Sequence, residues 1–270
     1  MSTKERLDVA LVTRGLAESR EKAQAMILSG AVFLNGQRAD KASMAVREED
    51  TLQTRGAPHP YVSRGGLKLE KALRVFSADV RGVTAMDLGA STGGFTDVLL
   101  RAGAAHVYAV DVGYGQLDWK LRNDPRVTVM ERTNARLLVP EMFPVRPSLA
   151  VMDVSFISIR LILPAAAAIM GETGRFLTLV KPQFEAGRGR VGKKGVVRDP
   201  QVHRDVLEEI RTFVQEMGWT VQGMDFSPIR GPEGNIEFLF DIVPQACARA
   251  NCGAEDVART VAAAHAAHGG

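Results

Sequence analysis

Seven short apolar segments, each long enough for a β-strand, are distributed between residue 85 and residue 241. They span residues 85–88, 104–111, 127–130, 148–153, 175–181, 219–226 and 236–241. Segments whose apolar residues recur at helical spacing precede or separate them, at 65–73, 118–122, 159–170 and 200–217. This alternation predicts an α/β domain with a doubly wound, mostly parallel, seven-stranded sheet. The last two strands are close in sequence, so we expect them to be antiparallel.

The N-terminal residues follow a different pattern, which predicts a separate α+β module. Apolar residues recur at helical spacing over 7–11 and 23–27, with Ser19 placed to cap the second helix. Asn35-Gly36 predicts the tight turn of a β-hairpin, and two prolines with a glycine at 54–61 indicate a linker. We therefore expect a module at 1–57, a linker at 58–64, the α/β domain at 65–250 and an alanine-rich C-terminal tail at 251–270.

A glycine-rich stretch at 85–97, with the sequence AMDLGASTGGFTD, predicts a strand, a tight turn and a helix start. Its glycines can take positive φ and bring backbone N–H groups close to a ligand at the carboxyl end of the strand. No lysine follows them as in a phosphate-binding P-loop, and the strict dinucleotide spacing Gly-x-Gly-x-x-Gly is absent. Asp87, two residues before the first glycine, suits an amino-bearing ligand. The stretch therefore favours S-adenosylmethionine over NAD.

A second acid supports this interpretation. Asp111 ends the next apolar segment, where a carboxylate can accept hydrogen bonds from ribose hydroxyls. Asn134, beyond the third strand, could contact an adenine edge or simply cap a loop. The residues predicted to bind the cofactor are Asp87, Gly89, Ser91, Thr92, Gly93, Gly94, Phe95, Asp111, Asn134 and Asp153.

The net charge of only +3 means that any affinity for nucleic acid must come from local clusters of basic residues. Such clusters occur in the N-terminal module, just before the α/β domain, and in the glycine-rich loop 186–199, where they suit a phosphate backbone. For any single arginine, a solvated helix face is as good an interpretation. The residues predicted to bind RNA are Arg6, Arg14, Arg20, Lys22, Arg64, Arg188, Arg190, Lys193 and Lys194.

Several function classes are disfavoured by composition. The two cysteines, Cys247 and Cys252, lack metal-ligand spacing, so we expect no metal site. The longest apolar stretch, 161–170, is about half the roughly 20 residues that a membrane-spanning helix requires. No N-terminal segment combines basic and apolar regions as a signal peptide does. We expect a cytoplasmic protein without a membrane partner.

Two lysines and two acids complete the candidate site. Asp153 and Lys181 end strands at the ligand-binding edge of the sheet, and Lys68 and Glu237 could join them. Lys68 would lie in the first turn of a helix, where the macrodipole disfavours a cation, so a role other than helix stability is indicated. This Lys-Asp-Lys-Glu set resembles that of the RrmJ/FtsJ type of RNA ribose 2′-O-methyltransferase.

Nearly the whole chain resembles the TlyA family. The resemblance rests on the catalytic set, on the segments 63–68, 87–96 and 180–185, and on the N-terminal module, whose 32–36 segment resembles the ending of an S-four type RNA-binding domain. It implies a Rossmann-like methyltransferase domain that uses S-adenosylmethionine to methylate cytidine 2′-hydroxyls in small- or large-subunit ribosomal RNA, or in both. A full N-terminal helix and an extended tail favour both subunits.

Lys68, Asp153, Lys181 and Glu237 are therefore the predicted catalytic residues. Lys181 is our candidate for the base that takes the proton of the ribose hydroxyl, although it could instead stabilise the developing alkoxide. Two alternatives of other classes stay open. The family's haemolysin label allows a pore-forming cytolysin, and the basic module allows an RNA-binding protein with a vestigial methyltransferase fold. The oligomeric state is not predicted.

Overall fold

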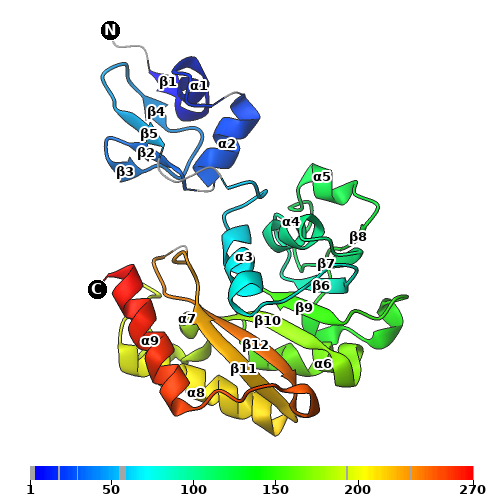
Figure 1. The fold of residues 1–270 in the computed structure, drawn as a ribbon. Coiled ribbons are helices and arrows are strands. Elements are labelled where there is room, and N and C mark those ends of the chain that lie inside the picture. Colours follow the sequence, from blue (N-terminus) through cyan, green and yellow to red (C-terminus); the bar gives the residue numbers. More distant parts are fainter. Residues whose placement is uncertain are drawn as a thin grey trace. The chain divides into compact units, whose positions relative to one another are not determined.

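The computed structural model describes residues 4–17, 19–28, 30–54, 59–192, 194–231 and 233–269. The chain divides into two compact units, Met1–Arg64 and Gly65–Gly270, which are described separately (Figure 1).

The first unit is a small α+β module. Its elements are β1 (Glu5–Arg6), α1 (Leu7–Thr13), α2 (Arg20–Leu28), β2 (Val32–Leu34), β3 (Gln37–Arg38), β4 (Ala45–Val46) and β5 (Leu52–Thr54). The predicted hairpin is present, because β2 pairs antiparallel with β3 through a turn in which Asn35 and Gly36 both have positive φ. Ser19 accepts a hydrogen bond from the Lys22 amide at 3.2 Å, as expected of a cap on α2. A core of its own, centred on Leu7, Leu11 and Ile27, holds the unit together.

The second unit contains the predicted alternation of strands and helices. Its strands are β6 (Thr84–Leu88), β7 (His106–Val110), β8 (Val127–Met130), β9 (Leu149–Met152), β10 (Arg175–Val180), β11 (Trp219–Phe226) and β12 (Phe238–Pro244). Its α-helices are α3 (Gly66–Val75), α4 (Gly94–Arg101), α5 (Trp119–Arg122), α6 (Leu163–Met170), α7 (Pro182–Glu185), α8 (Pro200–Glu216) and α9 (Ala254–His268). Short 3-10 helices are η1 (Ala135–Leu137), η2 (Pro140–Met142), η3 (Ile159–Leu161), η4 (Gly171–Thr173), η5 (Arg188–Arg190) and η6 (Gln245–Cys247).

The strand order in the sheet is β11-β12-β10-β9-β6-β7-β8. β12 runs antiparallel to both β10 and β11, and the other pairs are parallel, which confirms the predicted mostly parallel, seven-stranded sheet. The chain leaves β6 in one direction to β7 and β8, and later continues on its other side with β9 and β10. Such a reversal point is where open α/β sheets bind ligands, outside the carboxyl ends of the strands.

The prediction of a separate C-terminal tail at 251–270 is wrong. Residues 254–268 form α9, which packs against α8 and β11 (Figure 1). Val257, Val261 and Ala264 recur at helical spacing and are fully or almost fully buried in the core that α6 and α8 share with the sheet. The alanines between them are the exposed face of an integral helix.

The predicted helix 159–170 is also divided. It begins as η3 and restarts as α6, with Pro164 in the first turn of the second part. Proline has no backbone N–H and its ring restricts the preceding residue, so a continuous α-helix through this point is disfavoured.

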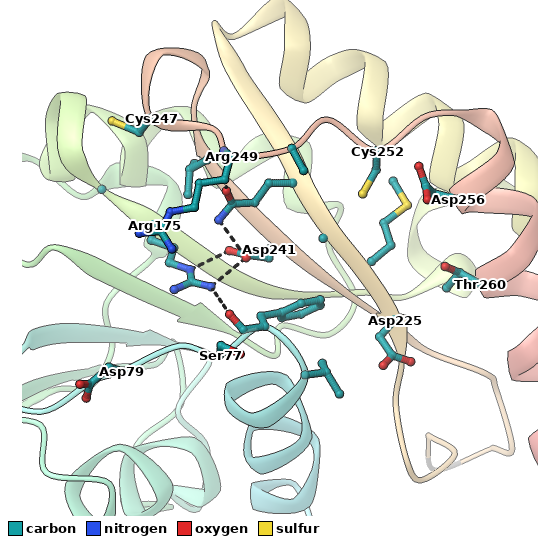
Figure 2. A pocket seen from close by; sticks show the side chains of 18 of the residues that line it. Ser77, Asp79, Arg175, Asp225, Asp241, Cys247, Arg249, Cys252, Asp256 and Thr260 are labelled. Atoms are coloured by element: carbon teal, nitrogen blue, oxygen red, sulfur yellow. Dashed lines mark hydrogen bonds and ion pairs between the residues drawn. The ribbon is translucent and has the colours of Figure 1, made fainter.

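A pocket of about 810 Å³ lies at the amino end of β10, the opposite end of that strand from Lys181 (Figure 2). In it, the Arg175 guanidinium donates two hydrogen bonds to the carboxylate of Asp241, at 2.7 and 2.8 Å, and one to the Phe76 carbonyl at 2.9 Å. Asp241 is only 3% exposed. The pair therefore fixes the end of α3 to β10 and β12.

Replacing Arg175 with methionine should destabilise the second unit by about 3 kcal/mol, because the variant leaves the buried Asp241 carboxylate without its cation. Urea unfolding would measure the loss. Arg259→Met is a matched control on the rim of the same pocket: Arg259 pairs with Asp256 but is largely exposed, so its loss should cost less than about 1 kcal/mol. Equal losses in the two variants would contradict a structural role for the Arg175–Asp241 pair.

Candidate active site

The structure brings all four predicted catalytic side chains together. The Lys68 ammonium lies 2.6 Å from Glu237 Oε2 and 3.1 Å from Asp153 Oδ2, and the Lys181 ammonium lies 2.6 Å from Asp153 Oδ1. Asp153 follows β9 and Lys181 follows β10, at the carboxyl edge of the sheet. Glu237 precedes β12, whose antiparallel register pairs Phe238 with Val180 and so places Glu237 at the same edge. We call these four residues the tetrad.

Two cations and two anions balance each other in this nearly buried cluster. Lys68 and Lys181 are each 6% exposed and Glu237 is 1% exposed. Burial opposes the charge of Lys68 most strongly, but the carboxylates of Asp153 and Glu237 together outweigh it and raise the pKa of Lys68. Burial likewise opposes ionisation of Asp153, yet the two ammonium groups lower its pKa. Lys68 and Asp153 are therefore held in their charged forms.

Ser155 and Phe156 extend the site in a way that the sequence analysis missed. Ser155 Oγ accepts a hydrogen bond from Lys181 at 2.9 Å. Phe156 is 91% exposed, has a φ of 65°, and its ring centroid lies 5.2 Å from that of Phe184, just after Lys181. A non-glycine residue in the left-handed region is strained, and such strain concentrates at functional sites. The only sequence signal was an apolar residue in a loop directly after Asp153.

Glu185 and Asn235 anchor the loops that carry the tetrad, and neither was predicted. Glu185 is buried and accepts hydrogen bonds from Ser158 Oγ at 2.6 Å and from the Ile159 amide at 2.9 Å. Asn235 is 2% exposed; it accepts from the Val197 amide at 3.0 Å and donates to the Gly195 carbonyl at 2.9 Å. The loops after β9 and β10 and the turn before Glu237 are thereby joined.

The glycine-rich turn lies beside the tetrad between β6 and α4. Gly89 and Gly93 have φ values of 86° and 94°, as a tight turn of this kind requires. Asp87 accepts hydrogen bonds from the Thr96 amide at 2.9 Å and the Thr96 hydroxyl at 2.7 Å, while its Oδ1 is buried without a hydrogen-bond partner. Burial raises the pKa of Asp87 to about 7. An orphaned carboxylate oxygen fits the amino group of S-adenosylmethionine.

Asp111 connects this turn to the end of β7. It accepts hydrogen bonds from the amides of Ser91 at 2.8 Å and Gly113 at 2.7 Å. The cavity between them measures about 10 Å³, room for about one water molecule, and Gln116 lies against Ser91 at 3.3 Å. The acid suits ribose hydroxyls chemically, provided that Gln116 moves aside.

The other predicted cofactor residues lie around the same turn, with two qualifications. Asn134 Oδ1 accepts a hydrogen bond from the Arg136 amide at 3.0 Å, so the structure shows the loop cap that was one of its two interpretations. The Phe95 side chain is 5% exposed and packs in the interior, so only its backbone could face a ligand. Thr92, Gly93 and Gly94 form the turn and the start of α4.

The arginines predicted to bind RNA in the first unit also hold that unit together. Arg6 and Arg20 bond to the buried carboxylate of Asp8, at 3.0 and 2.9 Å, and Arg6 above all lowers the pKa of Asp8. Their side chains remain 49% and 53% exposed. Arg14 donates to the carbonyls of Asp50 and Arg47. Lys22 is exposed and Arg64 is partly buried.

Several described residues of the basic loop 186–199 are held by contacts with the rest of the second unit. Arg190 donates to Glu209 on α8 at 2.8 Å and to the Ala186 carbonyl at 2.7 Å, while Val196 and Val197 are buried. Lys194 is exposed. Lys193 and the side chain of Arg188 lie outside the described residues.

The sequence pattern of FtsJ-like methyltransferases matches residues 61–242, which include the whole tetrad and the glycine-rich turn. The chain belongs to the FtsJ-like methyltransferase family. An S4 domain matches residues 5–52 of the first unit. These matches confirm the predicted combination of domains.

Relatives of known sequence or structure are similar to this chain over most of their length. A Bacillus subtilis protein provisionally named an rRNA methyltransferase is 54% identical, covering 89% of this chain and 86% of its own. The 16S/23S rRNA (cytidine-2′-O)-methyltransferase TlyA of Mycobacterium tuberculosis is 48% identical over 88% of this chain and 90% of its own. A Streptococcus thermophilus structure provisionally named a hemolysin is 47% identical, has a TM-score of 0.79, and covers 99% of this chain and 98% of its own. In the part of the chain that the structure describes, no helix has the length and apolar character needed to cross a membrane.

Proposed function

We propose that this protein transfers the methyl group of S-adenosylmethionine to the 2′-hydroxyl of a cytidine in small- or large-subunit ribosomal RNA, or in both. The observation that carries the proposal is the intact Lys68-Asp153-Lys181-Glu237 network beside a glycine-rich turn at the carboxyl edge of the sheet. The printed activity of the mycobacterial relative supplies the substrate class. A vestigial fold would not be expected to retain a buried, charge-balanced cluster of this kind, because burying charges is costly.

The residues around the turn have distinct tasks in holding the cofactor. Asp111 would accept hydrogen bonds from the ribose hydroxyls, Asp87 would face the amino group, and the backbone of 89–93 would line the remainder. When bound, the cofactor supplies an electrophilic sulfonium methyl group. The chain's own contribution is to fix the acceptor hydroxyl and to remove its proton.

Within the tetrad, Asp153 binds both ammonium groups and so fixes their separation. Lys68 is held as a cation between two carboxylates, which suits it to orient Asp153 and to attract the RNA rather than to accept a proton. Lys181 follows a buried strand, donates a further hydrogen bond to Ser155, and lies 5.9 Å from the centroid of the Phe184 ring. Once its ammonium has released a proton to solvent, the Lys181 amine would be placed to accept the proton of the 2′-hydroxyl at Nζ.

The S4 unit suits the same substrate. Exposed basic side chains on it would hold ribosomal RNA and raise the local concentration of the target at the second unit. Ribosomal subunits are then the partners, and their presence in the cytoplasm gives the location. A similar structure is named a hemolysin, but no feature of the described residues favours membrane lysis.

The direct test is methyl transfer from tritium-labelled S-adenosylmethionine to isolated small and large ribosomal subunits, assayed separately. Incorporation into RNA of at least one subunit is expected. A folded protein that binds the cofactor but labels neither subunit would overturn the proposal. Deleting residues 1–60 should reduce labelling but leave cofactor binding intact, which separates substrate capture from chemistry.

Binding of S-adenosylmethionine at pH 7 should release about half a proton from Asp87. Its pKa of about 7 means that the buried carboxyl is about half protonated, and an ammonium group placed against its orphaned oxygen would lower that pKa. Calorimetry in buffers of different ionisation enthalpy measures the release. The Asp87→Asn variant is the control and should release none.

The raised pKa of Asp87 also makes the free energy of unfolding depend on pH. A carboxyl whose pKa is raised in the folded state stabilises the fold at pH values below its unfolded pKa, and this contribution is lost as pH rises through about 7. Without cofactor, the wild type should lose stability relative to Asp87→Asn between pH 4 and pH 7. Parallel pH profiles for the two proteins would contradict the assignment.

A further inference from the structure

An exposed surface of aromatic and basic side chains lies next to the glycine-rich turn. Trp119 on α5 is 74% exposed and Tyr114, in the loop after β7, is 67% exposed. The guanidinium of Arg132 lies over the Tyr114 ring at 4.3 Å. We call this the α5 surface and define it by its residues, Tyr114, Trp119, Lys120, Arg132 and Arg136.

The charges of this region are unevenly paired. Its four carboxylates are all engaged: Asp111 accepts from the Ser91 and Gly113 amides, Asp118 caps α5, Asp124 pairs with Arg126, and Glu131 pairs with Arg122. In contrast, Lys120, Arg132 and Arg136 have exposed side chains and form no ion pair with any carboxylate that the structure describes. The surface therefore presents three cations around exposed aromatic rings.

The α5 surface is held rigidly against the candidate active site. The Asp118 amide donates to the Thr92 carbonyl of the glycine-rich turn at 3.2 Å. Leu117 and Leu121 are buried beneath Gly93, where an added Cβ would clash with the Leu121 side chain. The Gly115 amide and Arg122 both bond to Glu131, which joins the loop after β7 to α5 and to the end of β8. Trp119 thus projects from a helix that is joined by these contacts to the glycine-rich turn.

We propose that the α5 surface binds unpaired ribosomal RNA next to the methylated nucleotide, with a base stacked on Trp119 and phosphates near Lys120, Arg132 and Arg136. The inference rests on the proposed function, since it takes the substrate to be RNA. Every base has a flat π-face, so stacking on an exposed indole combined with a cationic border is the usual chemistry of single-strand binding. RNA is favoured over a protein partner because the three cations, which no described carboxylate pairs with, match the uniform negative charge of a phosphate backbone.

Intrinsic fluorescence gives a direct readout, because the chain has only two tryptophans and Trp219 is 8% exposed. Titration of the full-length protein with a single-stranded cytidine oligonucleotide should quench the emission of Trp119. The Trp119→Phe variant should lose the quenching signal, which assigns that signal to Trp119 rather than to Trp219. Unchanged emission of the wild type at saturating oligonucleotide would overturn the proposal.

Steady-state methylation of ribosomal subunits provides the second arm. Trp119→Ala should raise the KM for the subunit by about 5- to 100-fold, the range expected for one stacked base, with unchanged affinity for S-adenosylmethionine. Val145→Ala, which shortens another exposed apolar side chain outside the α5 surface, should behave as wild type. An unchanged KM in Trp119→Ala, or a parallel loss of cofactor affinity, would overturn the proposal while leaving the methyltransferase function standing. If the wild type labels no subunit, the proposed function fails, and the oligonucleotide titration still decides whether the surface binds RNA.

Discussion

Replacing Lys181 with methionine is expected to slow methyl transfer by about 10² to 10⁴-fold, the usual effect of removing a positioned acid–base group. Methionine retains most of the stem volume, so the buried strand end should keep its packing. The variant loses the ammonium that lies 2.6 Å from Asp153 and 2.9 Å from Ser155. Single-turnover transfer to ribosomal subunits would measure the rate, and calorimetry should show unchanged cofactor affinity.

Lys71 provides a matched control for this substitution. It is another largely buried lysine of the second unit, paired with Asp225 at 2.8 Å, but it lies outside the tetrad. Lys71→Met should lower stability and leave the rate per folded molecule close to wild type. Near-wild-type turnover of a folded Lys181→Met variant would reduce Lys181 to a structural role.

The Asp153→Asn substitution should cause the second large effect, a loss of at least about 10²-fold in transfer rate. Asparagine has nearly the same volume, but it cannot balance the two ammonium groups that Asp153 contacts. The substitution removes the carboxylate of Asp153, one of the two that raise the pKa of Lys68. Burial should therefore lower the pKa of Lys68 in the variant. The variant should also be less stable by about 3 kcal/mol, because it leaves buried cations underpaired.

Asp225→Asn, which breaks the Lys71 pair instead, is the control for Asp153→Asn. It should lose stability without a comparable loss of rate. If both variants lost rate in proportion to stability, the charge of Asp153 would matter for folding alone. Rate and unfolding free energy must therefore be measured on the same preparations.

The sequence predicted the catalytic edge because local patterns determine where strands end. Asp153 and Lys181 each follow an apolar segment directly, and parallel strands place their carboxyl ends together. The structure places Lys68 and Glu237 with them. The position of Lys68 in the first turn of a helix had marked it in the sequence, whereas Glu237 was selected by the family resemblance. The Lys68 ammonium lies 2.6 Å from Glu237 and 3.1 Å from Asp153, and these distances depend on how α3 and β12 pack.

The sequence could not predict side chains whose roles depend on distant contacts. Asn235 bonds to residues almost forty positions earlier, and Arg20 contacts an acid on another helix. The apolar face of α9 was hidden among alanines, which carry little pattern of their own, so a helix of the core was predicted as a tail. Phe156 read as an ordinary apolar loop residue because exposure and positive φ have no local signature.

The measurement that tests the central claim most directly is mass spectrometry of nucleosides from ribosomal RNA treated with the protein and S-adenosylmethionine. Unmodified subunits from a strain lacking the activity would be the substrate. We expect 2′-O-methylcytidine to appear in RNA treated with the wild type and to be at least about 100-fold slower to form with Lys181→Met. Methylation on the cytosine base, or equal formation of 2′-O-methylcytidine by both proteins, would contradict the role of the tetrad in ribose methylation.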